Sequence, residues 1–501
     1  MLTPTGPLPV CEVTRRCPRH RRRVFSPPPL TPYRSPSTFE LMTEVGRLHF
    51  LEHRQFGEIE TLLAARGVRV PRRTLQHLAD GFALRVVAVH LESWPLLARR
   101  LHEQGGYVLL LDTTGIPGRL TLQLIDGWSG LALLSASVAQ ESREDVSRIL
   151  RVLDGALGPP VVAVRDMSDG LDQALRAVWP GLYILTCHFH YLKAAGLRLF
   201  EVSYARLRSA IDRIGVKRRL RALAKRLRRE GGKSQEATQT RAWAEAILAS
   251  GKEAKGRPYP FSLSAVAFWR RCEEVRADLK ARLHRAGRRA TGAPYRQLEE
   301  VLDRLLAPSP RQHGLAREVR RLEARWTWFE RLRKALKFRN GPVPLATTGH
   351  LSERSLEHGR RRLDWLLGKL RAEEEQKGGG HDERELRRAL GRLREDLERR
   401  RGELLAPNVK VRGRVRPVPR TTALAEGEFR KLRRHGRRVK GVAEVEGPVQ
   451  REGPGLLLLE NLRDPAYIRL VYGSASRLAE RLGRVGPVAL QQAKLLTGLS
   501  G

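Results

Sequence analysis

Two aspartates, Asp112 and Asp166, close short apolar segments of the kind that form buried β-strands. If these two strands are neighbours, the carboxylates converge at one edge of a sheet. Converging carboxylates repel each other, and proteins commonly offset that repulsion with a divalent cation. Mg²⁺ prefers oxygen ligands, and two such ions about 3.5–4 Å apart can activate an attacking oxygen and stabilise the leaving oxygen of a phosphodiester. The alternative role for each aspartate is to cap a turn at the end of its strand.

The elements around these aspartates predict an α/β fold. Strands are expected at Tyr107–Leu111, Leu120–Ile125, Leu131–Val138, Val161–Val164 and Leu182–Leu185. Helices are expected at Ser142–Leu157 and Leu171–Trp179, the second followed by Pro180-Gly181. Three antiparallel strands followed by α/β units indicate a ribonuclease H-like mixed sheet.

The charge of the chain points to a polyanionic partner. The formal net charge is +40, and a fold does not need that excess. Nucleic acid is favoured, because Lys and Arg neutralise phosphates and release counterions. A membrane surface would also require apolar and aromatic faces, and no apolar run approaches the roughly 20 residues of a membrane span. The first residues lack a signal-peptide pattern, so we expect a soluble, cytoplasmic, nucleoid-associated protein with no membrane partner.

Composition and periodicity divide the chain into six expected segments. They are a flexible basic arm (1–44), a helical DNA-binding domain (45–100), the first part of the sheet core (105–200), a basic all-helical insertion (201–415), the completion of the core (416–475) and a C-terminal helix (476–501). Within the insertion, a leucine heptad predicts a helical hairpin or a short coiled coil, formed by Leu386, Leu390, Leu393, Leu397 and Leu404.

The helical segment 45–100 has the pattern of a helix-turn-helix. One short helix ends at Gly67, and Pro71 stands where the next helix begins. The second helix would present four polar side chains to the edges of DNA bases at its start, namely Arg72, Arg73, Gln76 and His77. The alternative is an ordinary helical hairpin with a solvated basic face.

The cysteines are too few for a disulfide framework. Two of the four, Cys11 and Cys17, stand close to His20 in the sequence. These three side chains would be three of the four ligands of a zinc site. The fourth ligand is missing and the spacing is unusual, so the other interpretation is a disordered basic tail. Zinc is therefore not the expected cofactor.

The stretch from Val161 to Gly196, VVAVRDMSDGLDQALRAVWPGLYILTCHFHYLKAAG, resembles the Mutator-like and related insertion-sequence transposases of bacteria and archaea. That family has an Asp, a Leu five residues later, a Pro-Gly and a Cys-x-x-His block. The resemblance assigns the second catalytic Asp to Asp166 and the block to Cys187 and His190, which would support the active site. Asp169, in Ser-Asp-Gly, is the alternative second Asp.

A second stretch, RTTALAEGEFRKLRRHGRRVKG from Arg420 to Gly441, resembles the family's Glu-bearing helix. The resemblance assigns the third carboxylate to Glu426, with Glu428 and Glu353 as alternatives. Thr422 and Ala423 stand where the family has two Asn. Three arginines on the same helical stripe as the Glu would hold the DNA backbone, namely Arg430, Arg433 and Arg437.

The resemblance implies a DDE transposase that uses Asp112, Asp166 and Glu426 to hold Mg²⁺, with Mn²⁺ as a substitute. Such an enzyme binds the terminal inverted repeats of an insertion sequence, cleaves the strand and transfers it to target DNA. Its partners would be double-stranded DNA and further copies of the chain, in a homodimer or higher oligomer. A decayed or domesticated copy that binds DNA without catalysis, a nuclease or resolvase, and a basic RNA-binding protein are the alternatives.

Overall fold

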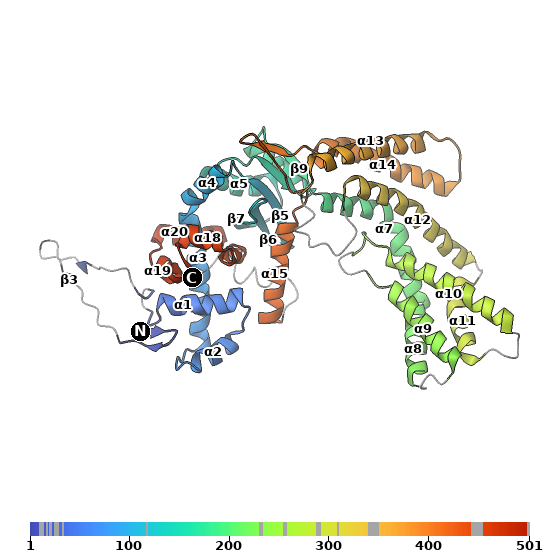
Figure 1. Cartoon of the computed structure of the whole chain (residues 1–501), viewed down its shortest axis with the longest axis horizontal. Helices are drawn as coiled ribbons and strands as arrows, with labels where there is room; N and C mark the ends of the chain where they lie inside the picture. The colour runs from blue at the N-terminus through green and yellow to red at the C-terminus, as the bar shows by residue number, and fades with distance from the viewer. Residues whose placement is uncertain are drawn as a thin grey trace. The chain divides into compact units, whose positions relative to one another are not determined.

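The computed structural model describes residues 1–9, 15–16, 19, 23–24, 30–32, 35–116, 119–229, 234–253, 258–286, 292–307, 310–338, 350–441 and 454–497 (Figure 1). The chain forms two compact units. The first contains Met1–Cys187, Leu345–Ser352 and Pro407–Gly501, and the second contains His188–Pro344 and Glu353–Ala406. The zinc site considered for Cys11, Cys17 and His20 lies outside the described residues.

A five-stranded mixed sheet forms the centre of the first unit, in the order β7-β6-β5-β8-β9. The strands are β5 (Val108–Ile116), β6 (Arg119–Asp126), β7 (Ala132–Val138), β8 (Val162–Arg165) and β9 (Ile184–Thr186). β5, β6 and β7 pair antiparallel, whereas β8 pairs parallel with both β5 and β9. The predicted α/β class and the predicted succession of strands and helices along the chain are therefore confirmed.

The first strand is longer than predicted. The expected strand ended at Leu111, but β5 continues through Asp112 to Ile116. The extension has a physical reason, because β6 supplies antiparallel partners along the whole of it, up to the pair Ile116↔Arg119. The parallel pairing with β8, by contrast, has its last pair at Leu110↔Val164. Asp112 therefore lies within a hairpin, just beyond the parallel part of the sheet.

One face of the sheet is covered by α5 (Arg143–Leu157) and α6 (Asp169–Val178). Both helices are amphipathic, and their buried stripes join the apolar side chains of one strand face in a single core cluster. Leu109 and Leu111 of β5 belong to this cluster. Since side chains alternate along a strand, Leu110 and Asp112 face the other side.

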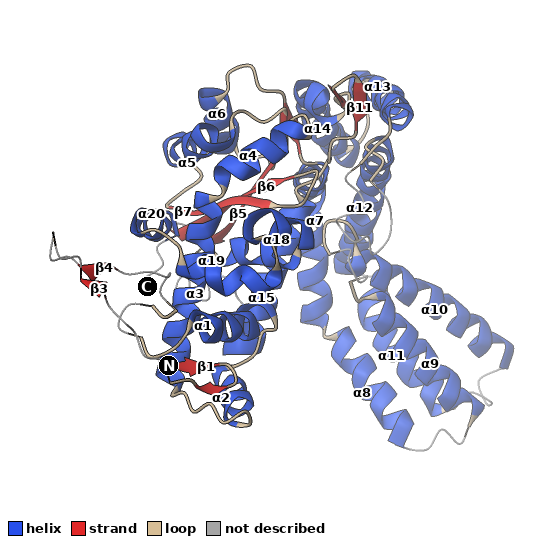
Figure 2. Cartoon of the chain, turned by 60° about the vertical axis from the view of Figure 1, so that its left-hand side comes forward, coloured by secondary structure: helices blue, strands red, loops and turns tan. Residues whose placement is uncertain are grey.

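The other face is packed against helices from both ends of the chain (Figure 2). They are α15 (Ala423–Lys440), α17 (Leu456–Leu459), α20 (Pro487–Thr497) and α3 (Arg72–Glu92). Polar contacts also link this part of the chain to β7: the side chain of Asn461, just after α17, makes two hydrogen bonds to the backbone of Ala132. His90 of α3 is fully buried and contacts the Leu133 carbonyl at 2.9 Å. Burial lowers the pKa of His90 to about 4, so this side chain is neutral at pH 7.

The N-terminal helices belong to the same compact unit as the sheet. They are α1 (Phe39–Gly46), η1 (Arg47–Leu51), α2 (Phe56–Ala64), α3 and α4 (Trp94–Glu103), preceded by short strand pairs β1 (Leu2–Thr3) with β2 (Gly6–Pro7) and β3 (Arg15–Arg16) with β4 (Arg23–Val24). Gly67, between α2 and α3, has a φ of +79°, which explains a glycine at this turn. The second half of α3 is buried in the unit, and only its beginning is free to present side chains to solvent.

The C-terminal part of the first unit begins with the hairpin β10 (Val409–Val411) and β11 (Arg414–Arg416), followed by α15. The remaining elements after α17 are η3 (Glu460–Arg463), α18 (Pro465–Tyr472), η4 (Ala475–Arg477), α19 (Leu478–Gly483) and α20. Trp128, in the β6–β7 turn, donates to the Pro417 carbonyl at 2.8 Å, and the Arg416 guanidinium lies 3.8 Å from its ring centroid. These contacts fix the chain just before α15.

The described part of the second unit is helical. Its elements are α7 (His188–Ile214), α8 (Val216–Arg229), α9 (Gln235–Ser250), α10 (Ser264–Ala286), α11 (Ala293–Leu306), α12 (Pro310–Ala335), α13 (Glu353–Glu375) and α14 (His381–Leu404). The predicted helical hairpin is formed by α13 and α14, with Gly378 and Gly379 in left-handed conformation at its tip. Among the described residues, no helix combines the length and apolarity that a membrane span needs.

Candidate metal centre

Two carboxylates from distant parts of the sequence meet on the second face of the sheet. One oxygen of Asp112 on β5 and one of Glu426 on α15 lie within 4.8 Å of each other. The Asp112 side chain is 4% exposed, and that of Glu426 is partly buried. Two carboxylates at this distance in a poorly solvated position repel each other, which favours a cation between them.

A row of buried polar side chains continues from Asp112 across the sheet. Asp112 pairs with Gln123 of β6, and Gln123 pairs with Ser135 of β7, so all three side chains lie on the same face. Gln123 and Ser135 are fully buried. Within the part of the chain that the structure describes, neither the Gln123 amide nor the Ser135 hydroxyl has a hydrogen-bond partner.

Gln123 and Ser135 were not among the residues that sequence reasoning selected. A signal was present: Gln123 alternates with Leu122 and Leu124, so a two-residue period places it on the face opposite the apolar core. Its position beside Asp112 depends on the strand register, which the sequence alone does not give. Leaving a buried polar group without a partner costs about 1–3 kcal/mol, which makes this row a candidate for contact with a bound ion or its water.

Asp166 comes directly after β8, the strand that pairs parallel with β5. The last parallel pair of these two strands is Leu110↔Val164, two residues before each aspartate, so the parallel pairing does not extend to Asp112 and Asp166. The Asp166 carboxylate accepts a hydrogen bond from the Ser168 amide at 2.8 Å, so it also caps the turn before α6. It does not lie within 4.8 Å of both Asp112 and Glu426. The structure thus brings two of the three expected carboxylates together, and the third, Asp166, follows the strand next to β5.

Asp169 is in a different setting. It is the first residue of α6 and is exposed. The glycine that follows it has a packing role, because a Cβ on Gly170 would lie 1.6 Å from the Glu141 carbonyl oxygen. The close approach of α6 to the chain before α5 therefore explains the glycine of the Ser-Asp-Gly sequence.

The local alternative to Glu426 is committed to another contact. Glu428 forms an ion pair with Lys431 at 2.8 Å, and Lys431 also contacts Glu460 at 3.1 Å. Burial raises the pKa of the Glu428 carboxyl, while the contact with Lys431 opposes that rise. Two residues further along a helix, the Glu428 side chain leaves the axis roughly 200° away from Glu426. The more distant alternative, Glu353, is the first residue of α13 in the second unit.

Cys187, from the Cys-x-x-His block, holds the start of α15. Cys187 follows β9 directly and is fully buried. Its sulfur accepts hydrogen bonds from the Thr422 amide at 3.4 Å and the Thr422 hydroxyl at 3.6 Å. Thr422 is the N-cap residue of α15, four positions before Glu426. Thr422 thus makes a contact that positions the helix carrying Glu426.

His190 lies in the first turn of α7 and is partly buried. Its neighbour His188 is buried and hydrogen-bonds the Leu404 carbonyl at 2.6 Å, which joins α7 to the end of α14 within the second unit. The chain therefore passes from one unit to the other within the Cys-x-x-His block. Cys187 belongs to the first unit, and His188 and His190 belong to the second.

The other end of α15 is held by the N-terminal helices. His435 lies 3.3 Å from His53 between their Nδ1 atoms, and Gln55 donates to the Arg438 carbonyl at 3.0 Å. Arg438 also forms an ion pair with Glu58 at 2.6 Å. Burial and then the proximity of His435 lower the pKa of His53 to about 4. Sequence reasoning missed these contacts, because nothing local links residues 53–58 to residues 435–438.

The residues expected to contact DNA lie on two helices, α3 and α15. Arg72, Arg73, Gln76 and His77 are exposed at the beginning of α3, and Arg72 forms an ion pair with Glu60 at 2.7 Å. On α15, the continuous helix aligns the three predicted arginines with Glu426, in the order Arg430, Arg433 and Arg437. None of these three arginines has an acidic partner among the described residues, unlike the neighbouring Arg438.

The residues of this site fit a divalent cation of the magnesium type. Carboxylate and amide oxygens are the donors that Mg²⁺ and Mn²⁺ prefer. The sheet supplies Asp112 and the amide of Gln123, which lacks a partner among the described residues, and α15 supplies Glu426. At a bond length of about 2.1 Å, two oxygens on opposite sides of one Mg²⁺ lie about 4.2 Å apart. The separation between Asp112 and Glu426 is compatible with that span.

Comparison of the sequence with known proteins identifies no family for this chain. No protein-family model matches the chain, and no curated protein matches it.

Proposed function

We propose that this chain is a DDE transposase with a ribonuclease H-like core. It would cleave the ends of an insertion sequence and transfer them to target DNA in a metal-dependent reaction. The observation that supports this proposal most strongly is the approach of Asp112 and Glu426 to within 4.8 Å on a buried, polar face of the sheet. The two residues are far apart in the sequence, and the sequence patterns predict both of them as metal-binding residues.

In this proposal Asp112, Asp166 and Glu426 hold the metal, and Gln123 contacts the metal or a water molecule bound to it. Bound divalent cations would activate the attacking oxygen and stabilise the leaving 3′ oxygen. The chain itself fixes the carboxylates: Asp112 by the β5–β6 pairing, and Glu426 by the contacts that hold α15 at both ends. Because the carboxylates are already fixed, no free energy is spent on ordering them during the reaction.

The arginines of α15 would bind the DNA strand beside the metal. Arg430, Arg433 and Arg437 follow Glu426 along one stripe at successive turns of the helix. Phosphate contacts of this kind position the duplex and carry no sequence information. Recognition of the terminal repeats is assigned to the beginning of α3, where Arg73, Gln76 and His77 are exposed as in a helix-turn-helix.

A strand-transfer assay tests this proposal. The purified full-length chain is incubated with labelled duplex DNA that carries the sequences flanking its reading frame, together with an unrelated target duplex. We expect joined donor–target products with Mg²⁺ or Mn²⁺ and none with EDTA. Cleavage without joining would indicate a nuclease. Binding without either reaction in any metal would indicate a decayed copy and would overturn the enzymatic proposal.

Paired substitutions identify the second aspartate. Asp166→Asn should reduce strand cleavage by about 100-fold, because loss of a metal-binding carboxylate removes charge stabilisation of the reacting phosphate. Asp169→Asn should change the rate by less than about threefold, because an exposed side chain in the first turn of a helix contributes little beyond the helix dipole. Single-turnover cleavage of the same duplex measures both. If Asp169→Asn is the more damaging change, the assignment of Asp166 is wrong.

A further inference from the structure

Helix α8 of the second unit carries an unusual concentration of positive charge. Its fourteen residues, Val216–Arg229, contain no acidic residue and no aromatic residue. Eight are basic: Lys217, Arg218, Arg219, Arg221, Lys225, Arg226, Arg228 and Arg229. This density exceeds what a solvated helix needs.

The helix buries one side and exposes the other. Its apolar stripe packs against α9 and α11 and consists of Val216, Leu220, Leu223 and Leu227. Arg218, Lys225 and Arg229 are exposed, and their spacing of seven and four residues places them on the face opposite that stripe. At about 1.5 Å per residue, these three cations extend over about 16 Å along the helix.

Five exposed cations of α8 have no acidic partner among the residues that the structure describes. Lys217 contacts Asp212 at 3.4 Å, and Arg228 contacts Glu245 at 2.7 Å. No ion pair joins Arg218, Lys225 or Arg229 to an acidic side chain among the residues that the structure describes, and the same holds for Arg219 and Arg221.

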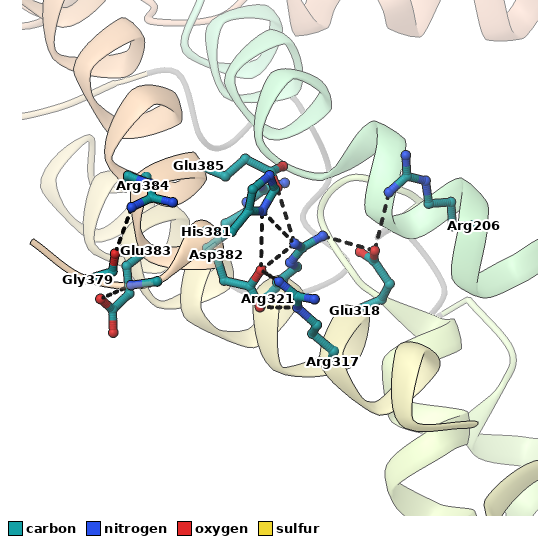
Figure 3. A network of polar contacts seen from close by, with 12 residues as sticks. Arg206, Arg317, Glu318, Arg321, Gly379, His381, Asp382, Glu383, Arg384 and Glu385 are labelled. Carbon is teal, nitrogen blue, oxygen red and sulfur yellow. Dashed lines mark hydrogen bonds and ion pairs between the residues drawn. The ribbon is translucent and has the colours of Figure 1, made fainter. Parts of the chain in front are cut away.

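Other arginines of the same unit are neutralised. Between α12 and α14, Arg317 and Arg321 both contact Asp382, and Arg321 also contacts Glu318 at 3.1 Å (Figure 3). The hydrogen bonds from Arg317 and Arg321 hold the pKa of Asp382 well below its ordinary value. Glu318 also contacts Arg206 at 3.4 Å. The unpaired charge of α8 is therefore a local feature and does not simply follow from an arginine-rich composition.

Uncompensated charge of this kind opposes folding. Basic side chains three or four positions apart, such as Arg221 and Lys225 or Lys225 and Arg229, are neighbours on the helix surface and repel each other. A polyanion that binds this face would remove the repulsion and gain from the release of counterions. A lipid surface is disfavoured because the exposed face has no aromatic or large apolar side chain, and unpaired strands are disfavoured because no aromatic ring is present to stack on a base.

We propose that the exposed face of α8 is a second DNA-binding surface, which binds the phosphate backbone of duplex DNA without reading its sequence. Arg218, Lys225 and Arg229 are its central contacts. The choice of DNA as the polyanion rests on the proposed function. The location of the surface rests on the charge and exposure of α8 alone.

Salt-dependent binding of the full-length chain tests this surface. Fluorescence anisotropy with an unrelated duplex of about 30 base pairs, between about 50 and 200 mM salt, gives the slope of log K against log salt. The triple variant Arg218→Gln, Lys225→Gln and Arg229→Gln should lower the magnitude of this slope by about 2–3, since each lost phosphate contact contributes about 0.9. Measuring in EDTA removes catalysis from the readout, so an inactive but DNA-binding chain would still give this result.

The matched control removes the same charge at neutralised positions of the same unit. Arg361, Arg371 and Arg401 are exposed and paired with Glu357, Glu398 and Asp364. Their triple replacement by Gln should leave the slope within about 0.5 of the wild-type value. The charge-preserving pair Arg218→Lys and Arg229→Lys should also retain it. Equal losses in the two triple variants, an unchanged slope in the α8 variant, or tighter binding of the wild type to anionic vesicles or duplex RNA would overturn the proposal.

Discussion

Replacing Asp112 with Asn is expected to lower metal-dependent strand cleavage by about 10³-fold, while DNA binding in EDTA stays unchanged. The amide keeps the shape of the side chain but removes the charge that would hold the cation opposite Glu426. Because Asp112 is buried in a paired strand, the Asn side chain that replaces it stays in the same buried position and does not turn toward solvent. Single-turnover cleavage with Mg²⁺ measures the effect, and Asp212→Asn, at an exposed aspartate of α7, is the control.

Thermal unfolding gives a second, independent readout of the same substitution. Without metal, Asp112→Asn should raise the melting temperature, since one of two repelling carboxylates is removed. Mg²⁺ at about 100 times its dissociation constant should stabilise the wild type by about 2.7 kcal/mol and the variant by much less. Equal stabilisation of both proteins by Mg²⁺ would show that Asp112 does not hold a metal.

Replacing Glu426 with Gln is expected to have an effect of similar size, about 10²–10³-fold on cleavage. Glu426 approaches Asp112 from α15, and a neutral amide at this position would bind a divalent cation weakly. The same assay measures the change, with binding to duplex DNA as the test of folding.

Glu428→Gln is the matched control for this prediction, being the same substitution two residues away on the same helix. It removes the ion pair with Lys431, which keeps Glu460 as a partner, so the expected loss of stability is about 1 kcal/mol or less. Cleavage should stay within about threefold of the wild-type rate, since the Glu428 side chain leaves the helix on another side. A larger loss of cleavage for Glu428→Gln than for Glu426→Gln would reverse the assignment.

The order of strands and helices around the site could be predicted from the sequence because the signals are local. Apolar runs, a two-residue alternation and stop signals such as Pro180-Gly181 act over a few residues. The helical hairpin of α13 and α14 follows in the same way from a leucine heptad and a glycine-rich tip. The end of β5 was misplaced, because its last residues are stabilised by pairing with β6 and not by their own apolar pattern.

For the candidate site too, local signals could be predicted from the sequence and contacts between distant segments could not. Asp112 could be selected from its strand, and Glu426 from a motif that resembles a known family. The separation of these two residues could not be predicted, since it depends on how α15 packs against β5 and β6. Asp166 shows the opposite case: its place after the strand next to β5 could be predicted from the sequence, but its hydrogen bond to the Ser168 amide could not.

The sequence by itself determined the class of the fold, the selection of Asp112 and Asp166 as candidates and the excess of positive charge, because all three are recorded in residue types and short-range spacing. Only the tertiary structure decided that Glu426, and not Glu428, lies beside Asp112, and that Gln123 and Ser135 extend the polar row. It also decided that Arg317 and Arg321 are neutralised, whereas Arg218 and Arg229 of α8 have no acidic partner among the described residues. The physical reason is that contacts between segments far apart in the chain depend on packing and register, which no local pattern encodes.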